Sequence, residues 1–408
     1  MQITYGKVDY KPEDVGYNSE RLDVLNTHFE RLMNEKLIQS AAYCLSRDGK
    51  VFTHNAIGKH SFKEDDSRLL QPDVMRGVAS ITKIFCSTAI FKLCEDGFIR
   101  LNQPVHTILQ EMNESPFNEI TIAHLLSHTS GLQPDHGCFP HEYSQPWAYI
   151  DQLQKSGENT SWVKASMKAG MFTKPGKEWA YCSFGFVLLG EIIHRVTGIR
   201  AEEYIHKTIL DPLEMTDSYF ENEFYLRTAS NDSAKKLCER LYVQNEDDLQ
   251  IVEALKSYKQ GDTSTASEED LFWANIPCTG GGLISTTADL NKFGRMLIND
   301  GYSDSGKRII GRKAIERMTE NYTLPEIKDN CWGAGGVYRM YGLGPDTRRN
   351  ADSHYSKDSF FHEGAGACCL LMDPKERMVA SWFVPFADYD WHPEALYNAS
   401  AVMWSGLK

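Results

Sequence analysis

Residues 77–92 read Gly77-Val-Ala-Ser80-Ile-Thr-Lys83-Ile-Phe-Cys-Ser-Thr-Ala-Ile-Phe-Lys92, and both a fold and a chemistry can be predicted from them. Apolar residues recur at helical spacing after Ser80, which predicts a helix with one buried face. Ser80 and Lys83 are three residues apart, so they would share a helix face about one turn from each other. A serine hydroxyl needs an adjacent base to act as a nucleophile, and N–H groups at a helix start can stabilise an oxyanion. The segment therefore suits a serine that becomes acylated with help from an amine.

The same serine–lysine spacing occurs twice more, at Ser161/Lys164 and at Ser233/Lys236. One match at this spacing is therefore weak evidence by itself. Both further matches lie in polar, lysine-rich surroundings that predict solvated surface, whereas apolar residues surround Ser80. We expect Ser80, and neither of the other two serines, to be the nucleophile.

The composition of the 408-residue chain is that of an ordinary globular protein, with 41% hydrophobic and 11% aromatic residues. The formal net charge of −13 argues against nucleic acid or an anionic membrane as the main partner. No stretch approaches the ~18 consecutive apolar residues of a membrane span, and residues 1–10 do not resemble a signal peptide. We expect a small-molecule acyl substrate, with no nucleic acid and no membrane as partner, and the oligomeric state stays open.

The ten cysteines of the chain lack the spacing of a disulfide framework, and they form no C-x-x-C pair. Cys44, Cys86 and Cys94 lie in apolar segments, and Cys368-Cys369 lies in a strand-like run. Reduced thiols packed as small hydrophobic groups fit this pattern best and indicate a reducing compartment. Together with the absence of a signal peptide, this predicts a cytoplasmic protein.

Strand-like segments occur near both ends of the chain. Residues 40–54 form two such runs around Asp48-Gly49, a strong hairpin signal, and residues 19–33 before them carry a helical stripe. Near the other end, a second hairpin and a terminal helix are predicted over residues 367–372, 378–384 and 393–404. The two ends could therefore meet in one antiparallel sheet.

The middle of the chain is rich in helix signals, at residues 121–128, 184–197 and 287–298. Residues 221–270 are polar and charge-rich, and they form either an insertion beside a cleft or a solvated excursion.

Strands at both ends with helices between them predict an α+β fold. It consists of an antiparallel sheet built from both chain ends with flanking helices, and an inserted helical lobe. We expect residues 1–79 and 280–408 to form the sheet lobe and residues 80–279 the mainly helical lobe. A ligand cleft between the two lobes would then lie beside Ser80.

Two further motifs could complete a site. Tyr181-Cys-Ser183 places a phenol and a small hydroxyl just before a helix, and a tyrosine beside an ammonium group can act as a general base. The run His362-Glu-Gly364-Ala365 suits a strand edge that binds an acyl substrate through backbone N–H groups. Taken alone, Tyr181 would more often be a packed aromatic side chain, and His362 would more often be structural.

In their order, Ser80-Ile-Thr-Lys83, Tyr181-Cys-Ser183 and His362-Glu-Gly364 resemble the three motifs of serine β-lactamases and penicillin-binding proteins. The similarity is greatest to the class C-type branch, which includes esterases, D-aminopeptidases and acyltransferases. The resemblance covers roughly residues 20 to 400. It implies a β-lactamase/transpeptidase-like fold.

The resemblance also implies a role for each matched residue. Ser80 would be the acylated nucleophile, Lys83 would help to deprotonate it, and Tyr181 would act with Lys83 as general base and later as acid. Backbone N–H groups of Ser80 and Ala365 would form the oxyanion hole. The remaining contacts to the substrate would come from His362, Gly364 and Ser183.

Two departures from the family pattern bear on the substrate. His362 stands where most true β-lactamases have a lysine, and a neutral imidazole is a weaker partner for a β-lactam carboxylate. Ser183 replaces the asparagine common in the second motif. The resemblance therefore favours hydrolysis of esters or small amides through an acyl-enzyme at Ser80. Acyl transfer to a small-molecule or natural-product acceptor is the alternative, because hydrolysis and transfer differ only in which nucleophile completes deacylation.

Other functions have less support. D-aminopeptidase or β-lactamase activity would use the same residues, and a non-catalytic binding module is disfavoured by the intact motifs. Metal-dependent hydrolysis through His124 and His128 lacks an H-E-x-x-H pattern and an identifiable third ligand. An α/β-hydrolase is disfavoured because the sequence contains no G-x-S-x-G. We expect neither a cofactor nor a bound metal.

Overall fold

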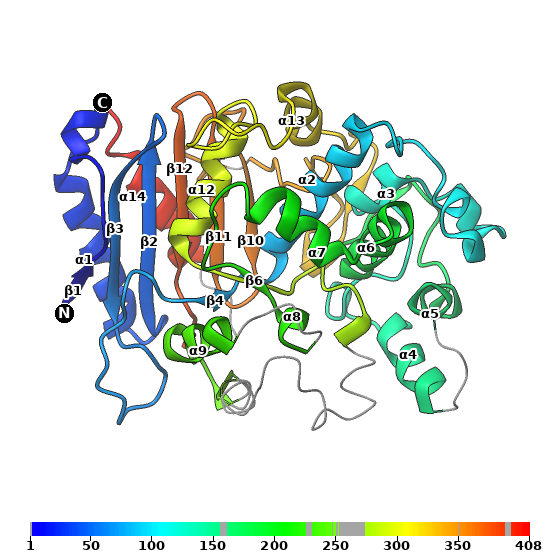
Figure 1. Ribbon diagram of the computed structural model, residues 1–408, viewed down its shortest axis with the longest axis horizontal. Coiled ribbons are helices and arrows are strands. Elements are labelled where there is room, and N and C mark those ends of the chain that lie inside the picture. The colour runs from blue at the N-terminus through cyan, green and yellow to red at the C-terminus, as the bar shows by residue number, and fades with distance from the viewer. Residues whose placement is uncertain are drawn as a thin grey trace.

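A large antiparallel sheet, made of strands from both ends of the chain, organises the molecule. The structure is a computed structural model that describes residues 2–155, 161–225, 231–246, 248–249, 252, 274–349, 351–387 and 393–408. The sheet has six strands in the order β1-β3-β2-β12-β11-β10 (Figure 1). Their bounds are β1 Ile3–Tyr5, β3 Lys50–Gly58, β2 Ser40–Arg47, β12 Met378–Phe383, β11 Cys368–Asp373 and β10 Phe360–Gly364. Every neighbouring pair is antiparallel, so the predicted α+β architecture is confirmed.

The hairpin between β2 and β3 turns at the residues that the sequence indicated. Asp48 and Gly49 both have positive φ, 50° and 75°, as the twisted two-residue turns of hairpins require. Side chains then alternate between the two faces of the sheet. Ala41 and Tyr43 of β2 pack in one hydrophobic cluster, whereas Ala42 between them belongs to another. This alternation gives the sheet two buried faces.

Helices cover both of these faces. Helices α1 (Glu20–Asn34) and α14 (Ala399–Trp404) pack on one face, and α12 (Thr287–Ile298) packs on the other (Figure 1). The Asn291 amide of α12 donates to the carbonyls of Cys44 and Val379, which fixes the helix to two strands. A Cβ at Gly294 would lie 2.5 Å from Cγ1 of Val379, so glycine permits this close approach. The predicted terminal helix is α14 preceded by a π-helical turn at Glu394–Asn398.

The middle of the chain forms a second, mainly helical region beside β10 (Figure 1). Its helices are α2 Thr82–Glu95, α3 Ile122–Leu126, α4 Pro146–Lys155, α5 Trp162–Ala169, α6 Ser183–Thr197, α7 Ala201–Ile205 and α8 Glu221–Tyr225. Helix α9, Asn231–Arg240, lies apart from them near β4 (Figure 1). Later helix α13 spans Arg312–Thr319. Helix α2 is buried nearly all round, and its Phe85 stacks on Phe293 of α12 with ring centres 3.8 Å apart. Helix α2 therefore joins the helical region to the sheet.

Two small sheets hold the segments that lead into the site. One has the order β4-β7-β6, with β4 Arg76–Gly77, β7 Leu283–Ser285 and β6 Tyr219–Phe220. The other has the order β5-β8-β9, with β5 Glu178–Trp179, β8 Lys328–Asp329 and β9 Val337–Tyr338. Strand β4 precedes Ser80 and β5 precedes Tyr181, so these sheets set where both motifs lie.

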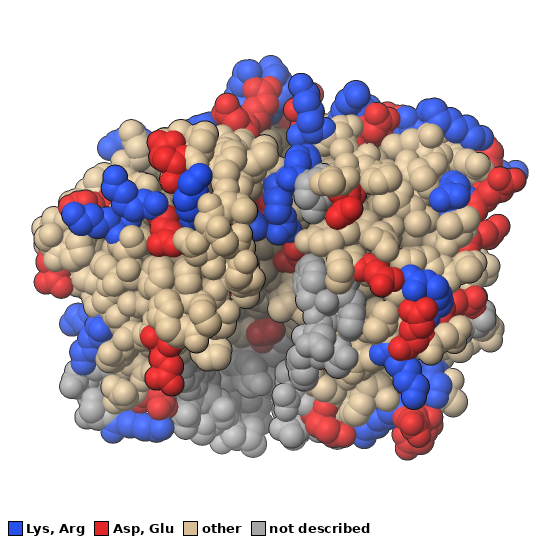
Figure 2. Space-filling model, turned by 180° about the vertical axis from the view of Figure 1, so that it is seen from behind, with Lys and Arg blue, Asp and Glu red and all other residues tan. Residues whose placement is uncertain are grey.

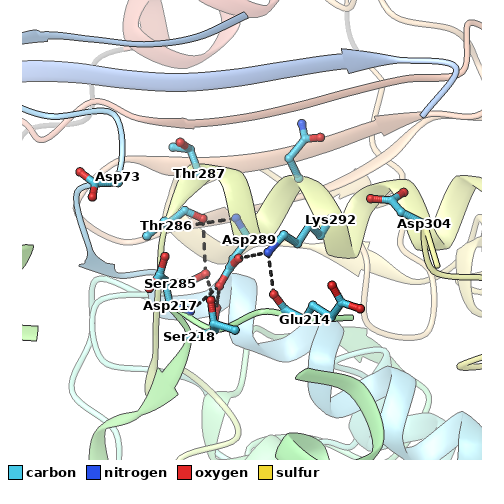
Figure 3. Close-up of polar contacts among 12 residues, drawn as sticks. Asp73, Glu214, Asp217, Ser218, Ser285, Thr286, Thr287, Asp289, Lys292 and Asp304 are labelled. Carbon is cyan, nitrogen blue, oxygen red and sulfur yellow. Dashed lines mark hydrogen bonds and ion pairs between the residues drawn. The ribbon is translucent and has the colours of Figure 1, made fainter. Parts of the chain in front are cut away.

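A buried carboxylate fixes the junction between β7 and α12 (Figure 3). Asp289 accepts hydrogen bonds from the Asp217 N–H at 2.8 Å and the Ser218 hydroxyl at 3.0 Å, and it pairs with Lys292 at 2.9 Å. Thr286 caps the helix by accepting from the Asp289 N–H. Because all these partners are within the protein, we interpret the cluster as structural support for β7 and hence for β4.

The described part of the polar segment 221–270 is not simply solvated surface. Leu237 of α9, with Leu241 and Val243 just after that helix, packs against Met75 beside β4 and Ile284 of β7. Residues 226–230, 247, 250–251 and 253–273 lie outside the described residues, so most of the insertion prediction stays untested. The proposed division into residues 1–79 with 280–408 and residues 80–279 likewise stays a prediction.

The face drawn in Figure 2 is hollowed by a groove, and acidic and basic side chains are interspersed over it. Much of the surface beside the groove comes from uncharged residues. Within the part of the chain that the structure describes, no helix is both long enough and apolar enough to cross a bilayer.

Candidate active site

Ser80 lies in a short 3-10 turn, Ala79–Ile81, that leads directly into α2. Ala79 adopts a φ of 44°, a left-handed conformation that is costly for a residue with a Cβ and often marks functional positions. The Thr82 hydroxyl donates to the Ala79 carbonyl and accepts from the Leu283 N–H, so β7 holds the turn. Ser80 itself is partly exposed. A substrate can therefore reach its hydroxyl at the start of a helix, as the sequence suggested.

Lys83 is completely buried beneath Ser80. Its ammonium donates to Ser80 Oγ at 2.9 Å and to the Gly280 carbonyl at 2.6 Å. Burial lowers the pKa of Lys83 to about 8, while the charge of Asp135 partly opposes this shift. Near neutral pH a usable fraction of the amine is thus unprotonated and lies at hydrogen-bond distance from the serine hydroxyl.

Tyr181 lies between β5 and α6 and completes the contact. Its hydroxyl interacts with the Ser80 side chain, and the Lys83 Nζ lies 4.8 Å from the centre of its ring. Burial raises the pKa of Tyr181 well above its usual value, and the nearby Tyr341 and Asp135 add to the effect. The structure therefore brings Ser80, Lys83 and Tyr181 together. Its electrostatics favour Lys83 as the first base and Tyr181 as a neutral proton donor.

Ser183, at the first turn of α6, is held by a residue that the sequence analysis missed. The Asp135 carboxylate accepts from the Ser183 N–H at 2.6 Å and from its hydroxyl at 2.5 Å. The Asp135 N–H in turn donates to the Tyr181 carbonyl at 2.8 Å. Asp135 therefore positions the second motif from a loop 48 residues earlier. It also places a negative charge beside Lys83, while the predicted substrate contact of Ser183 stays a prediction.

Strand β10 passes close to the segment before Ser80. A Cβ on Gly364 would lie 2.3 Å from the Val78 carbonyl oxygen, so the position requires glycine. The Cys368 thiol also contacts that carbonyl, at 3.4 Å. Ala365 follows at the exposed start of the turn into β11. This arrangement brings the turn to the nucleophile, and the role of Ala365 in an oxyanion hole stays a prediction.

His362 is buried beside the site as a neutral imidazole. Burial and, to a smaller extent, the neighbouring Lys83 charge lower its pKa to about 3. Nδ1 lies 2.6 Å from the Glu363 carbonyl and must carry the proton, because a carbonyl oxygen can only accept. Nε2 is then an acceptor 3.2 Å from the Tyr341 hydroxyl, whose one proton can go either to Nε2 or to the Gly344 carbonyl at 2.8 Å. His362 therefore presents no positive charge to a substrate, and its expected weaker binding of a β-lactam carboxylate stays a prediction.

Arg76 supports the β10–β11 turn, and no sequence motif indicated it. The side chain is 7% exposed, and its guanidinium donates to the Gly366 carbonyl and to Gln244 Oε1 at 2.6 Å. Burial lowers its pKa, and no ion pair to it is found within the described residues. This buried cation therefore holds the residue that follows Ala365.

A network of paired charges lies behind His362. Arg339 bridges Asp329 at 3.4 Å and Asp346 at 2.6 Å, and it stacks over the Trp179 ring. Arg348 contacts both Asp346 and Glu363. Burial opposes ionisation of Asp346, but the two guanidinium groups hold its pKa below the usual value. These opposite charges compensate one another, and their ion pairs hold the side chains in place behind His362.

The serines and histidines that were considered as alternatives lie elsewhere or make structural contacts. Ser161 caps α5 by accepting from the Lys164 N–H, and the side chain of Ser233 lies outside the described residues. The His124 ring accepts from the Thr121 N–H. His128 Nδ1 accepts from the Cys182 N–H, and its ring packs on Tyr181. These contacts fit the structural interpretation of both histidines.

A helical region against an antiparallel sheet, with a serine and a lysine at the start of the helix that joins them, defines a β-lactamase-like fold. The profile of the family described as Beta-lactamase matches residues 25–390, so the chain belongs to that family. Protein flp of Staphylococcus aureus (strain COL) is 31% identical over 205 residues, or 49% of this chain and 39% of that protein. Lovastatin esterase of Penicillium rubens is 27% identical over 218 residues, or 48% of this chain and 52% of that protein. The chain thus spans about half or less of the curated relatives it matches.

Solved structures extend the likeness over nearly the whole chain. A family VIII carboxylesterase matches with a TM-score of 0.68 and 20% identity, and covers 99% of both chains. A penicillin-binding protein homologue from Caulobacter crescentus matches with a TM-score of 0.68 and 17% sequence identity, and the match covers 100% of both chains. Simvastatin synthase from Aspergillus terreus matches with a TM-score of 0.68 and 18% sequence identity, and the match covers 94% of this chain and 98% of that one. At such identities the likeness shows the fold, and the family with these neighbours fits a serine hydrolase or acyltransferase.

Proposed function

We propose that the protein is a serine hydrolase that forms an acyl-enzyme at Ser80 and acts on esters or small amides. The observation that carries this proposal is the contact between the partly exposed Ser80 hydroxyl and the buried Lys83 amine at 2.9 Å. A nucleophile within hydrogen-bond reach of a base of matched pKa is what covalent catalysis needs. Membership of the family supports the same conclusion.

Each proton in the proposed reaction has a donor and an acceptor. Unprotonated Lys83 takes the proton of Ser80 as Oγ attacks the acyl carbonyl, and N–H groups of Ser80 and Ala365 receive the oxyanion. Tyr181 gives its proton to the leaving alcohol or amine and regains one from Lys83. Water then attacks the acyl-enzyme by the reverse sequence of proton transfers. If an alcohol attacks in its place, the acyl group is transferred to that acceptor.

The surroundings of Ser80 favour a neutral, apolar acyl group. Trp332 is 59% exposed, and its ring centre lies 5.4 Å from that of Tyr181, so it offers an apolar surface beside the nucleophile. Phe139 packs near Tyr181 and against Phe172, which extends this aromatic surface. Asp135 adds a negative charge that would repel a carboxylate on the substrate.

We also propose a cytoplasmic location. All ten cysteines are free thiols, seven of them buried and three of intermediate exposure, as expected in a reducing compartment. Fractionation of the cells that make the protein, with a blot for the chain, would test this. Recovery from a secreted or surface fraction would contradict it.

Active-site labelling tests the proposed function. A fluorophosphonate should modify Ser80 stoichiometrically, and mass spectrometry of a tryptic digest would locate the label. Labelling at another serine, or none in a folded protein, would exclude the acyl-enzyme.

A substrate panel would then separate the possible activities. It comprises p-nitrophenyl esters of short and long acyl chains, D-amino acid amides and nitrocefin, each with and without an acceptor alcohol. We expect turnover of the esters to exceed that of nitrocefin by at least tenfold. Faster product release together with acylated alcohol would identify a transferase, and rapid nitrocefin turnover would contradict the preference for esters.

A further inference from the structure

Two buried thiols lie on either side of the backbone of Tyr181. The Cys138 thiol donates to the Tyr181 carbonyl at 3.7 Å, and the Cys331 sulfur accepts from the Tyr181 N–H at 3.5 Å. The two thiols also interact with each other, and this interaction raises the pKa of Cys138. They come from segments 193 residues apart in the chain, which meet in the small cluster around Tyr181.

The two segments are connected by a backbone contact as well. The Trp332 N–H donates to the Cys138 carbonyl at 2.7 Å, so the residue after Cys331 is tied to Cys138 itself. The thiols share a small hydrophobic cluster with Trp179, Ile327 and Tyr341. Their contact therefore belongs to a defined packing arrangement next to the proposed catalytic groups.

We propose that Cys138 and Cys331 form a dithiol modification site that small oxidants convert to a disulfide, and that this bond impairs the reaction at Ser80. The effect on activity rests on the proposed function, whereas the bond itself does not. A peroxide would oxidise one thiol to a sulfenic acid and be reduced to an alcohol or water. The second thiol would then attack that sulfur, forming the S–S bond and releasing water.

Access to the site depends on the segment after Cys331. Cys138 and Cys331 are each about 1% exposed, and the neighbouring Cys331 thiol, together with burial, raises the pKa of Cys138. Because thiolates are the reactive species, oxidation would be slow until the segment opens. Trp332 and Gly333 after Cys331 are exposed, and Gly333, Gly335 and Gly336 all have positive φ. Opening of this glycine-rich segment would admit a small oxidant without unfolding the core.

The bond would act on catalysis through the position of Tyr181. An S–S bond is about 2.05 Å long, which is much shorter than any non-bonded contact between two sulfurs, so the two thiols would have to approach each other. Both sulfurs contact the Tyr181 peptide groups, so the backbone between them must move. A displacement of about 1 Å in a catalytic group can cost as much as 100-fold in rate. The Tyr181 hydroxyl would then no longer lie where it contacts Ser80.

The test uses diamide, which joins two thiols as a disulfide and is itself reduced to the hydrazine. Treated wild-type protein should yield a Cys138–Cys331 linked peptide by mass spectrometry. Its kcat for a p-nitrophenyl ester should fall at least tenfold and return on addition of dithiothreitol. Cys138→Ser and Cys331→Ser should keep near-normal kcat before treatment and be insensitive to diamide.

Controls separate this site from the other thiols. Cys94→Ser removes a more accessible thiol far from Tyr181 in sequence and should leave the oxidative loss unchanged. Oxidative loss that persists in Cys138→Ser, absence of the linked peptide, or a linked peptide with unchanged kcat would each overturn the proposal. If the reduced protein neither hydrolyses esters nor labels at Ser80, the proposed function fails. The linked peptide would then still decide whether the dithiol site exists.

Discussion

Two groups of buried cations lie around Ser80, and they have opposite surroundings. Lys83 is fully buried, and within the described residues it contacts a hydroxyl and a carbonyl but pairs with no carboxylate. Arg339 and Arg348 are also largely buried, but each contacts two carboxylates. Burial without a paired anion lowers the pKa and makes a proton available, whereas burial with one fixes the charge. The first group is suited to proton transfer and the second to rigidity.

Arg76 combines features of both groups. Like Lys83 it is buried and, within the described residues, makes no ion pair, but guanidinium does not lose its proton at ordinary pH. It can therefore orient the Gly366 carbonyl as a fixed charge but cannot act as a base. A buried lysine can therefore take part in proton transfer, whereas a buried arginine can only hold neighbouring groups in place.

The largest expected effect is a loss of activity when the site around Lys83 is changed. Ser80→Ala should reduce ester turnover by about 10⁴-fold or more, because the nucleophile that Lys83 activates is lost. Steady-state kinetics with circular dichroism as a check on folding would measure it. Ser161→Ala is the matched control, since it removes a serine in the same spacing. It should cost at most about 1 kcal/mol of stability as a lost helix cap and leave kcat unchanged. Equal losses in the two variants would contradict the assignment of Ser80.

A smaller effect is expected when a paired charge is removed. Asp346→Asn would leave Arg339 and Arg348 each with one carboxylate in a buried site, and should destabilise the protein by about 3 kcal/mol. Urea unfolding followed by tryptophan fluorescence would measure the change. Glu320→Gln breaks the exposed pair with Arg317 and should cost less than about 1 kcal/mol. If both variants lost the same stability, the buried network would stabilise the fold no more than an exposed ion pair does.

The smallest effect is expected at Arg76. Arg76→Gln should lower kcat about tenfold with little change in KM, because a misplaced turn weakens oxyanion stabilisation without affecting ground-state binding. Affinity for a boronic acid that mimics the tetrahedral intermediate should fall by the same factor, and Arg76→Lys should recover part of it. Arg68→Gln, which alters an exposed ion pair, serves as the control. A rise in KM with unchanged kcat would show that Arg76 acts on binding and not on the turn.

The sequence allowed Ser80, Lys83 and Tyr181 to be named because their signals are local and occur in a recognisable order. The hairpin of β2 and β3 was predictable for the same reason, because the Asp48-Gly49 pair itself favours the tight turn. Asp135 and Arg76 could not be found this way. Asp135 meets Ser183 from a loop 48 residues away, and Arg76 meets Gly366 across 290 residues. Such contacts depend on how loops are brought together by the whole fold.

The charged network and the dithiol show the same limit. Arg339 and Asp346 are close in sequence, but their burial against Trp179 and His362 depends on β5 and β10. Cys138 and Cys331 looked like ordinary packed thiols, because nothing in the sequence placed both at Tyr181. In Gln133-Pro-Asp135, the proline and the acidic residue indicate a loop, but they do not indicate that it lies at the site.

The pH dependence of Ser80 acylation tests the central claim most directly. Only unprotonated Lys83 can accept the serine proton, and its pKa is lowered to about 8. The rate of the pre-steady-state burst with a p-nitrophenyl ester should therefore rise about tenfold per pH unit below pH 8 and level off above it. Lys83→Met, which keeps the side-chain volume but has no amine, should abolish this ionisation together with most of the rate. A burst rate that is already maximal at pH 6, or that rises only near pH 10, would contradict Lys83 as the base.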